Sequence, residues 1–348
     1  MNTANNEPIL LLFDIDNTLI EASKAPPQGV VDCAHRAVQR VFEQRGITGV
    51  NAKPIFRNAR GQTHKEVFTQ VVRRALGEGA SSAETHAILD QIKEAYCNEL
   101  ITLPHNSHTL CPNAHTLLNS LGGKKNVICG LLVDDWAAIA CARLANTGTL
   151  DHFVYRYGMD IDLSSQNAQS LNKLRVSEVR FLNNGGDVPK ISVNYFISTR
   201  SGNNGVTAAT TLSQSGLLLG AFAEDGETCR DLVPLSIKRI QATTGIDVPM
   251  HRIFVVGDRP TDIKCARAAG VHSIAVATGR FPSKRLQNDY PTILLPHLPL
   301  SADELIKRLH PHLAGSEARE ARAPGARHHR QAPVLGANAL PGKKTQSI

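Results

Sequence analysis

Near the N-terminus, an apolar run leads directly into two carboxylates. Residues 10–13 are Leu-Leu-Leu-Phe, and Asp14 and Asp16 follow them. A short apolar run of this kind is typical of a strand that is buried on both faces of a parallel sheet. Such sheets bind ligands just beyond the carboxyl ends of their strands, so Asp14 is expected at the mouth of a site. Side chains alternate along an extended chain, so Asp14 and Asp16 would share one side, where Mg²⁺ would relieve their repulsion.

A second segment repeats this pattern. Residues 253–256 form an apolar run that ends at Gly257 and Asp258, and Asp262 follows within a segment of helical periodicity. Each segment taken alone is also compatible with a polar turn after a strand. In a parallel sheet both sets of carboxylates would meet at the same edge. Together, the two segments therefore predict a single acidic site.

The rest of the chain has the pattern of an α/β protein. Apolar runs typical of buried strands occur at 127–133 and 273–277, with helical periodicity between the runs. Such alternation predicts a doubly wound parallel sheet with right-handed crossovers. Residues 292–295 are expected to add an edge strand, and residues 302–309 a closing helix. Residues 29–102 differ, because they carry helical periodicity alone.

We therefore predict a core, two insertions and a tail. The core comprises residues 1–22, 103–158 and 220–312, and residues 23–102 form a helical insertion. Residues 159–219 are polar and rich in Asn and Ser, which favours a disordered or loosely ordered insertion. A second structured insertion over the site is the alternative. The tail, 313–348, is basic and rich in Ala, Gly and Pro, so we expect it to be disordered.

Charge and cysteine content narrow the class of protein. The net charge of +7 lies largely in the tail, so we expect no nucleic-acid partner. No stretch approaches the roughly 18 apolar residues that span a bilayer, so we expect no membrane partner. The seven cysteines show no CxxC spacing, which favours a reducing, cytoplasmic location. The oligomeric state is left open by the sequence.

The two acidic segments resemble motifs of the haloacid dehalogenase (HAD) superfamily of phosphohydrolases. Asp14–Thr18 is similar to the first motif of that family, and residues 257–262 are similar to its fourth. The resemblance covers roughly residues 8–158 and 220–310. It implies a Rossmann-like core with an α-helical cap inserted over the active site.

Two further segments carry the resemblance. Residues 110–114, Leu-Cys-Pro-Asn-Ala, are similar to the family's entry into its second core unit. Residues 220–222 and 230–235 resemble a branch close to the phosphoglycolate phosphatases. This implies a small phosphorylated metabolite as the partner, with phosphoglycolate as one candidate.

The resemblance implies roles for the acidic residues. Asp14 would attack phosphorus and form an aspartyl-phosphate, while Asp16 would protonate the leaving alcohol and later deprotonate water. Asp14, Asp16 and Asp258 would bind Mg²⁺. Retention of Asp16 favours phosphate chemistry over carbon–halogen cleavage, because the dehalogenases of the family lack that acid.

Other residues are expected to hold the substrate. Thr18 and Asp134 are candidates for the phosphate site, and Gly61 lies in a cap loop that resembles a substrate-specificity loop. Arg230 is the candidate for the cation beside the nucleophile, with Lys238 as the alternative. Each of these residues also has a plain structural interpretation as a turn, a cap or a surface ion pair.

One residue supports the others, and one departs from the family pattern. Asp262 would orient the cation, support the metal or cap the following helix. Val133 stands where the family has a Ser or Thr hydroxyl that binds the phosphoryl group. Asp134 and Asp135 follow Val133, and either of them is a candidate cap for the helix expected from Trp136. Loss of one such donor costs on the order of 100-fold in rate. Two alternatives to a phosphatase are therefore open, namely a phosphomutase and a catalytically impaired binding or regulatory protein.

Overall fold

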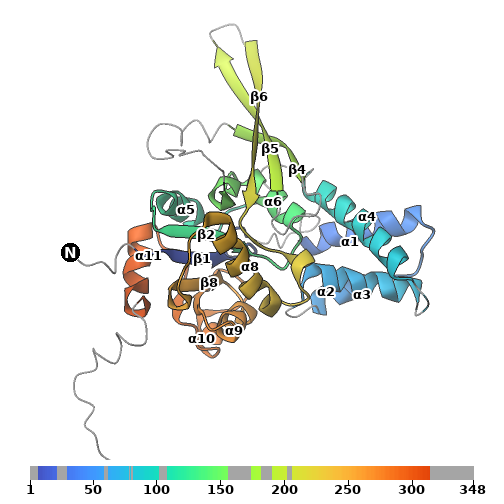
Figure 1. The fold of residues 1–348 in the computed structure, drawn as a ribbon. Coiled ribbons are helices and arrows are strands. Elements are labelled where there is room, and N and C mark those ends of the chain that lie inside the picture. Colours follow the sequence, from blue (N-terminus) through green and yellow to red (C-terminus); the bar gives the residue numbers. More distant parts are fainter. Residues whose placement is uncertain are drawn as a thin grey trace, which may run out of the picture. The chain divides into compact units, whose positions relative to one another are not determined.

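The computed structural model describes residues 7–21, 30–58, 62–77, 79, 81–101, 108–155, 174–181, 190–201 and 206–313. Apart from Leu313, the predicted tail lies outside these residues. Figure 1 shows a central sheet with helices on both faces, a group of helices at one side and a long hairpin.

The central sheet has six parallel strands in the order β10-β9-β8-β1-β2-β7. The strands are β1 (Ile9–Phe13), β2 (Val127–Leu132), β7 (Gly220–Ala221), β8 (Ile253–Gly257), β9 (His272–Val276) and β10 (Ile293–Leu295). This sheet confirms the predicted doubly wound α/β class. The chain order reverses between β1 and β8, and in open α/β sheets the ligand site lies at that reversal, beyond the carboxyl ends of the strands.

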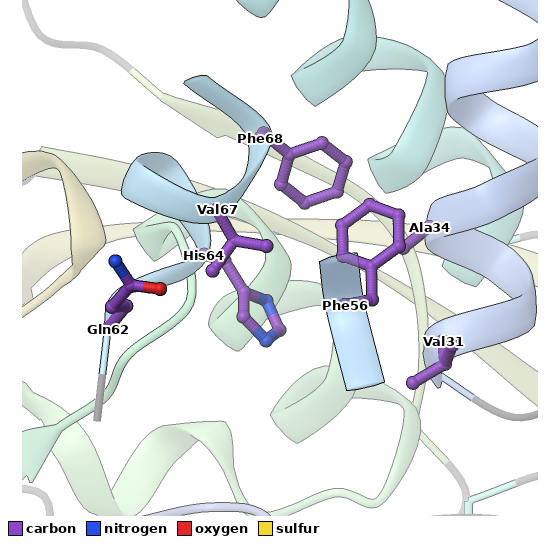
Figure 2. Close-up of a pocket in the computed structure, with 7 residues that line it drawn as sticks. All are labelled: Val31, Ala34, Phe56, Gln62, His64, Val67 and Phe68. Atoms are coloured by element: carbon purple, nitrogen blue, oxygen red, sulfur yellow. The ribbon is translucent and has the colours of Figure 1, made fainter. Parts of the chain in front are cut away.

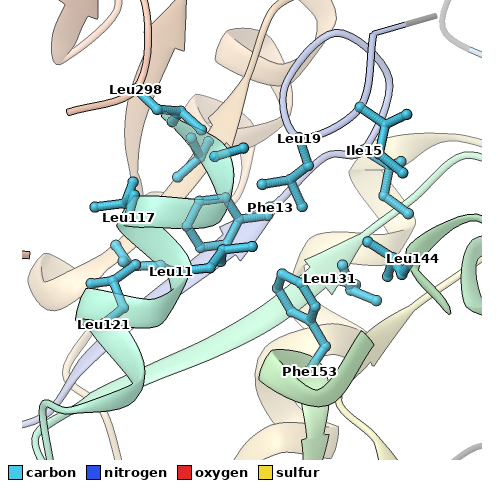
Figure 3. Packing of buried hydrophobic residues seen from close by; sticks show 14 of the residues in the cluster. Leu11, Phe13, Ile15, Leu19, Leu117, Leu121, Leu131, Leu144, Phe153 and Leu298 are labelled. Atoms are coloured by element: carbon cyan, nitrogen blue, oxygen red, sulfur yellow. The ribbon is translucent and has the colours of Figure 1, made fainter. Parts of the chain in front are cut away.

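Strand β1 shows why the sheet is buried on both faces. Leu11 and Phe13 pack into one apolar cluster, and Leu10 and Leu12 pack into another. Figure 3 shows the first cluster, in which Leu11 and Phe13 meet Leu117 and other side chains of the neighbouring helices. The helices on this face are α5 (Ala114–Gly122), α6 (Ala137–Asn146) and α11 (Ala302–Leu309), and those on the other face are α8 (Cys229–Thr244) and α9 (Pro260–Ala268).

Shorter elements connect these layers. They are α10 (Ser283–Gln287) and four 3-10 helices, η3 (Leu150–Phe153), η4 (Ala223–Asp225), η5 (Met250–Arg252) and η6 (His310–His312). The predicted edge strand at 292–295 and the closing helix at 302–309 correspond to β10 and α11.

Four helices form among the described residues of the predicted helical insertion. They are α1 (Val30–Gln44), α2 (Lys53–Asn58), α3 (His64–Leu76) and α4 (Ser82–Ile101). Their apolar stripes meet in a cluster of their own, which Trp136 and Ile139 of the core also join. We call these four helices the cap. Because the cap has its own apolar cluster and shares it with α6, packing against the core stabilises its position.

The second insertion, for which the sequence favours a disordered or loosely ordered segment over a structured one, contains strands among its described residues. β4 (Leu174–Phe181), β5 (Lys190–Ser201) and β6 (Val206–Leu218) pair antiparallel, and β3 (Val154–Tyr155) pairs with β6. Residues 190–197, Lys-Ile-Ser-Val-Asn-Tyr-Phe-Ile, have the pattern of one strand, and they lie within β5. The composition of this segment did not predict the sheet, because polar segments can also pair as strands. Backbone hydrogen bonds between neighbouring strands do not require a long apolar run.

One cysteine pair also departs from the sequence-based expectation. Cys229 at the start of α8 and Cys265 in α9 form a disulfide that links the two helices on one face of the sheet. Cys129, by contrast, has no disulfide, and neither has the buried Cys141. The sequence predicted a reducing location, which does not favour a disulfide such as this one.

None of the helices in the described ranges is long and apolar enough to cross a membrane.

Candidate functional site

Three buried carboxylates meet at the carboxyl edge of the sheet, at the reversal between β1 and β8. One carboxylate oxygen from each of Asp14, Asp258 and Asp262 lies within 4.8 Å of the other two. Phe13 pairs with Val256 across the two strands, so the residues that follow them leave the sheet side by side. The structure thus brings together Asp14 and Asp258, which are 258 − 14 = 244 positions apart in the sequence.

Burial and mutual repulsion act on these carboxylates together. Burial raises the pKa of Asp258 to about 7, and the neighbouring carboxylate of Asp262 adds to the shift. Burial also raises the pKa of Asp14 well above its usual value, although Arg259 opposes the shift. The pKa of Asp262 is raised by burial as well. Such a cluster is most stable with a proton or a cation among its oxygens.

The residues fit a divalent metal ion. Both carboxylate oxygens of Asp258 are buried and lack a hydrogen-bond partner among the described residues. A buried carboxylate without a partner is costly, and a hard cation with oxygen ligands would offset that cost. Asp14, Asp258 and Asp262 would hold such an ion, and the predicted ligand Asp16 is not among these three clustered carboxylates of the described residues.

The loop after β1 fixes the nucleophile candidate. The Asp14 amide donates to the Val256 carbonyl at 2.9 Å, which continues the sheet by one residue. The Thr18 hydroxyl donates to Asp14 Oδ2 at 3.3 Å. Asn17 has a left-handed backbone (φ 56°), a conformation that Asn tolerates better than most residues. The predicted phosphate-site residue Thr18 is therefore placed against Asp14.

A small residue brings a second loop onto the cluster. A Cβ atom at Gly279 would overlap Oδ2 of Asp258. The neighbouring Thr278 hydroxyl donates to the Asn17 carbonyl, which ties this loop to the loop after β1. Glycine at 279 is thus required by close approach to a carboxylate of the site.

Arg259, not Arg230, is the cation that the structure places at the cluster. The Arg259 guanidinium donates to Asp134 Oδ2 at 2.6 Å and to Asp14 Oδ1 at 3.4 Å, and it lies 3.6 Å from Asp262 Oδ1. Arg230 is exposed on α8, and its described contacts include none of these carboxylates. Lys238 on α8 is exposed as well. Arg259 follows Asp258 directly, so its position after a strand that delivers a carboxylate was the signal in the sequence.

Besides its place in the candidate metal cluster, Asp262 has the two other contacts considered for it. Its Oδ2 accepts the backbone N–H of Arg259 at 2.9 Å, which caps α9. Its other oxygen faces the Arg259 guanidinium. Asp262 therefore caps the helix and orients the cation at the same time.

Val133 and Asp134 depart from the family pattern, in which a hydroxyl side chain at the position of Val133 faces the phosphate site. The Val133 side chain is buried in the apolar cluster under the sheet, and its amide donates to the Ala221 carbonyl at 3.1 Å. Asp134 instead turns its carboxylate toward Arg259. Burial alone would raise the pKa of Asp134, but Arg259 and His64 hold it below its usual value. A carboxylate, rather than a hydroxyl, thus lies beside the site's arginine.

The acid candidate Asp16 is paired with a buried arginine. Arg143 of α6 donates to Asp16 Oδ1, and its own side chain is only 1% exposed. Sequence reasoning missed Arg143, although a lone arginine in the Ala-rich segment 137–145 was a signal of a buried ion pair. Because Arg143 is fixed within α6, it holds Asp16 beside the cluster.

A histidine of the cap reaches the same edge. His64 at the start of α3 donates its backbone N–H to the Asp134 carbonyl at 2.6 Å, and its Nδ1 lies 3.1 Å from Asp135 Oδ1. Burial lowers the pKa of His64, but Asp135 outweighs that effect and raises it to about 9. Asp135 Oδ1 also accepts the Trp136 amide at 2.9 Å, but Trp136 is itself the N-cap of α6, so neither Asp134 nor Asp135 is the cap that the sequence suggested. Gly61, the predicted residue of the cap loop, lies outside the described residues.

Backbone contacts join the cap to the core around this histidine. Thr63, which precedes α3, donates its N–H to Glu227 O at 3.0 Å and its hydroxyl to Gly226 O at 3.1 Å. Lys65 donates to the Glu224 carbonyl at 3.1 Å. These bonds hold the start of α3 against the segment before α8.

Comparison with known proteins finds a family model that is similar to the C-terminal part of the core. A family model described as HAD-hydrolase-like matches residues 228–300, which contain Asp258, Arg259 and Asp262. This match confirms the resemblance to the HAD-like superfamily that the sequence motifs indicated. No curated protein matches the chain.

Several solved structures are similar to the chain at low identity. A β-phosphoglucomutase from Clostridium difficile is 12% identical, with 88% of this chain and 99% of that chain covered and a TM-score of 0.47. A hydrolase from Pseudomonas syringae is 14% identical, with coverages of 86% and 98% and a TM-score of 0.45. A HAD-like family hydrolase from Streptococcus pneumoniae is 13% identical, with coverages of 86% and 97% and a TM-score of 0.41.

Proposed function

We propose that this protein is a Mg²⁺-dependent phosphatase that hydrolyses a small phosphomonoester through an aspartyl-phosphate on Asp14. The observation that carries the proposal is the buried cluster of Asp14, Asp258 and Asp262 beside Arg259. A bound Mg²⁺ would neutralise charge on the phosphoryl oxygens and on these carboxylates. The HAD-like match over residues 228–300 supports the same assignment.

In the first half-reaction, an Asp14 oxygen attacks phosphorus in line with the leaving oxygen. A bond forms between Asp14 and phosphorus, and the bond from phosphorus to the leaving oxygen breaks. Asp16 gives its proton to that oxygen, so that an alcohol departs. Arg259, 3.4 Å from Asp14 Oδ1, is placed to hold the phosphoryl oxygens.

In the second half-reaction, water attacks the phosphorus of the aspartyl-phosphate. Asp16, now a carboxylate, takes the proton of that water, and the bond between phosphorus and Asp14 breaks. Inorganic phosphate leaves and Asp14 is restored. Arg143 fixes Asp16 beside the reacting atoms in both steps.

One observation favours a second candidate function, a catalytically impaired binding or regulatory protein. Arg259 already contacts Asp14 and Asp134, and Asp134 would compete with phosphate for it. A phosphate-binding arginine that is held by carboxylates binds a phosphoryl group less readily.

A phosphomonoester panel, assayed with Mg²⁺ and with EDTA, tests the proposal. The panel includes phosphoglycolate, because the sequence resembles that branch, together with sugar phosphates and short alkyl phosphates. We expect turnover that requires Mg²⁺ and that Asp14→Asn abolishes. Metal binding by calorimetry without turnover of any panel member would contradict the phosphatase and support the binding protein.

A further inference from the structure

The disulfide between Cys229 and Cys265 takes no part in the chemistry described above. Cys229 is the first residue of α8 and Cys265 lies in α9, with Cα atoms 6.0 Å apart, a separation that a disulfide spans. In the reducing location that the sequence predicts, a disulfide would be transient and redox-sensing rather than permanent. The pair therefore needs an explanation outside the reaction steps.

One end of the disulfide adjoins the segment that holds the cap. Residues 226–228, which we call the cap anchor, stand directly before Cys229. Thr63 of the cap donates two hydrogen bonds to carbonyls of the cap anchor, at 3.0 and 3.1 Å, and Gln62 forms an antiparallel bridge with it. Because the Thr63 side chain caps the start of α3, the position of that helix depends on the position of the cap anchor.

The same end of α3 lines a cavity of the cap. This cavity has a volume of about 70 Å³, and its wall includes Gln62, His64 and Val67, which Figure 2 shows from close by. Phe56 and Phe68 complete the wall there and pack edge to face, with ring centroids 4.8 Å apart. A shift of the cap anchor would therefore also change the wall of this cavity.

The other end of the disulfide adjoins the carboxylate cluster. Cys265 lies three residues after Asp262 in α9, so the two side chains project from the same side of the helix. Cys229 Sγ also lies 3.8 Å from the carbonyl oxygen of Thr261, the residue before Asp262. The disulfide thus links the cap anchor covalently to the helix that carries a carboxylate of the site.

The two sulfur atoms differ in their exposure. Cys265 is buried, with 3% of its surface exposed, whereas Cys229 is partly exposed. A small thiol can therefore reach Cys229, which lies at a helix start where the backbone favours negative charge. Thiolates are the attacking and leaving species in thiol–disulfide exchange, and accessible disulfides are the labile ones.

We propose that Cys229 and Cys265 form a reversible redox switch whose oxidised state holds the cap anchor and α9 together. The thiolate of a small thiol such as glutathione attacks the Cys229 sulfur, and the bond to Cys265 breaks. Cys265 leaves as a thiolate and takes a proton. A second thiolate then attacks the glutathione sulfur of the mixed disulfide and releases Cys229. Two electrons pass to the protein, which gains two thiols, while two glutathione molecules become one disulfide.

Reduction leaves only noncovalent contacts between the cap anchor and α9. The start of α3 and the first turns of α9 should therefore open more readily in the reduced chain. The consequence for the metal rests on the proposed function, in which Asp262 is a candidate ligand. Loss of support behind a ligand lowers metal affinity by about 10-fold or more, so the oxidised chain should bind Mg²⁺ more tightly.

Peptide mapping of the full chain after equilibration in glutathione buffers tests the switch itself. We expect the link between Cys229 and Cys265 to disappear in excess reduced glutathione and to return in excess oxidised glutathione. A pair that stays linked in the native chain under excess reduced glutathione, or that is linked in neither buffer, overturns the proposal.

Hydrogen exchange in the same two buffers tests the mechanical link. Amides at 63–77 and 260–268 should exchange about 10-fold faster in the reduced chain, while those of α5 should not change. Cys229→Ser should exchange at the faster rate in both buffers. Cys97→Ser, which removes a cysteine that forms no disulfide, is the matched control and should keep the wild-type response. Equal exchange in the two buffers overturns the inference.

Magnesium calorimetry separates this inference from the proposed function. We expect the Mg²⁺ affinity to be about 10-fold weaker in the reduced chain, and equally weak in Cys229→Ser in both buffers. If neither state binds Mg²⁺ while hydrogen exchange still responds, the phosphatase proposal fails and the switch is supported. Mg²⁺ affinity that is equal in both states overturns the coupling to Asp262, whether or not a phosphomonoester is turned over.

Discussion

The edge of the core sheet and the cavity of the cap lie on either side of His64, but they are built in opposite ways. At the sheet edge, carboxylates are buried among one another, and Asp258 lacks hydrogen-bond partners among the described residues. In the cap, apolar side chains from three helices surround a small space with two polar groups. The sheet edge keeps buried charges close together at an electrostatic cost, whereas the cap encloses an apolar space of defined size. The comparison teaches that buried charge and an apolar cavity are built by separate parts of the fold.

The largest effect is expected at the nucleophile. Asp14→Asn should lower kcat by more than about 1000-fold, because an amide cannot form the acyl-phosphate. Steady-state phosphate release with the best substrate of the panel measures this. Circular dichroism should show an intact fold. Turnover close to wild type would remove Asp14 from the mechanism and break the division between the two regions.

The next effect tests the close approach at the core edge. Gly279→Ala should lower kcat/KM by about 100-fold, because the added methyl displaces the Asp258 carboxylate. Gly122→Ala in α5 is the matched control, since a Cβ there meets its nearest atom at 3.7 Å and should leave activity unchanged. Calorimetric Mg²⁺ affinity should weaken in Gly279→Ala alone. Equal metal affinity in the two variants would argue against Asp258 as a ligand.

Variants of Asp134, which contacts Arg259, can distinguish an enzyme from a binding protein. Asp134→Ser should raise kcat/KM by about 10-fold, because it frees Arg259 and supplies a hydroxyl. Asp134→Asn separates the two effects, since it removes the charge without adding a hydroxyl. Val133→Thr should not raise activity, because that side chain lies in the apolar cluster. A fall in activity in both Asp134 variants would give Asp134 a positive role at the site.

The two acidic residues of the first motif should differ in their effects on stability. Asp16→Asn should lower the free energy of unfolding by about 3 kcal/mol, because Arg143 is left buried without its carboxylate partner. Asp14→Asn should raise it in EDTA, because it removes a charge from a repulsive cluster. Urea unfolding of the two variants, which carry the same chemical change, measures the difference. Equal changes in both would show that Arg143 is satisfied in another way.

The smallest effect is a pH dependence of stability without metal. The pKa of Asp258 is raised from 3.8 to about 7 by burial, so between these values the folded protein binds more protons than the unfolded one. The stabilisation by the protonated carboxyl should therefore be present below about pH 4 and lost as the pH rises through about 7. Unfolding midpoints at pH 5.5 and pH 7.5 in EDTA measure this loss, which saturating Mg²⁺ or Asp258→Asn should reduce. A midpoint that rises with pH in EDTA and is unchanged in Asp258→Asn would contradict the assigned shift.

Sequence reasoning was most successful where the pattern was local. The apolar runs before Asp14 and Asp258 predicted buried parallel strands, and parallel strands bring their carboxyl ends to one edge. The helices of the cap could also be predicted from local pattern, because apolar residues that recur at helical spacing mark the buried side of a helix. In contrast, the strands at 174–181 and 206–218 carried too little apolar pattern to be predicted, and only residues 190–197 of the strand at 190–201 had the pattern of one.

Residues that act through distant partners were missed or misplaced. Arg230 was selected because it opens a segment similar to the family, but the direction of α8 leaves it exposed. Arg259 and Arg143 reach the site because β8 and α6 deliver them to it. The residues next to Arg259 and Arg143 in the sequence do not indicate which carboxylate each arginine contacts.

By itself, the sequence determined the class of the fold and the acidic edge of its sheet, because hydrophobic periodicity and strand ends are properties of neighbouring residues. Tertiary structure alone decided which cation meets Asp14, where Asp134 points and what the cap encloses. These depend on distances between segments far apart in the chain, and such distances are set by the packing of whole helices and strands. The acidic motif is thus local, while its partners and the cap cavity are products of packing.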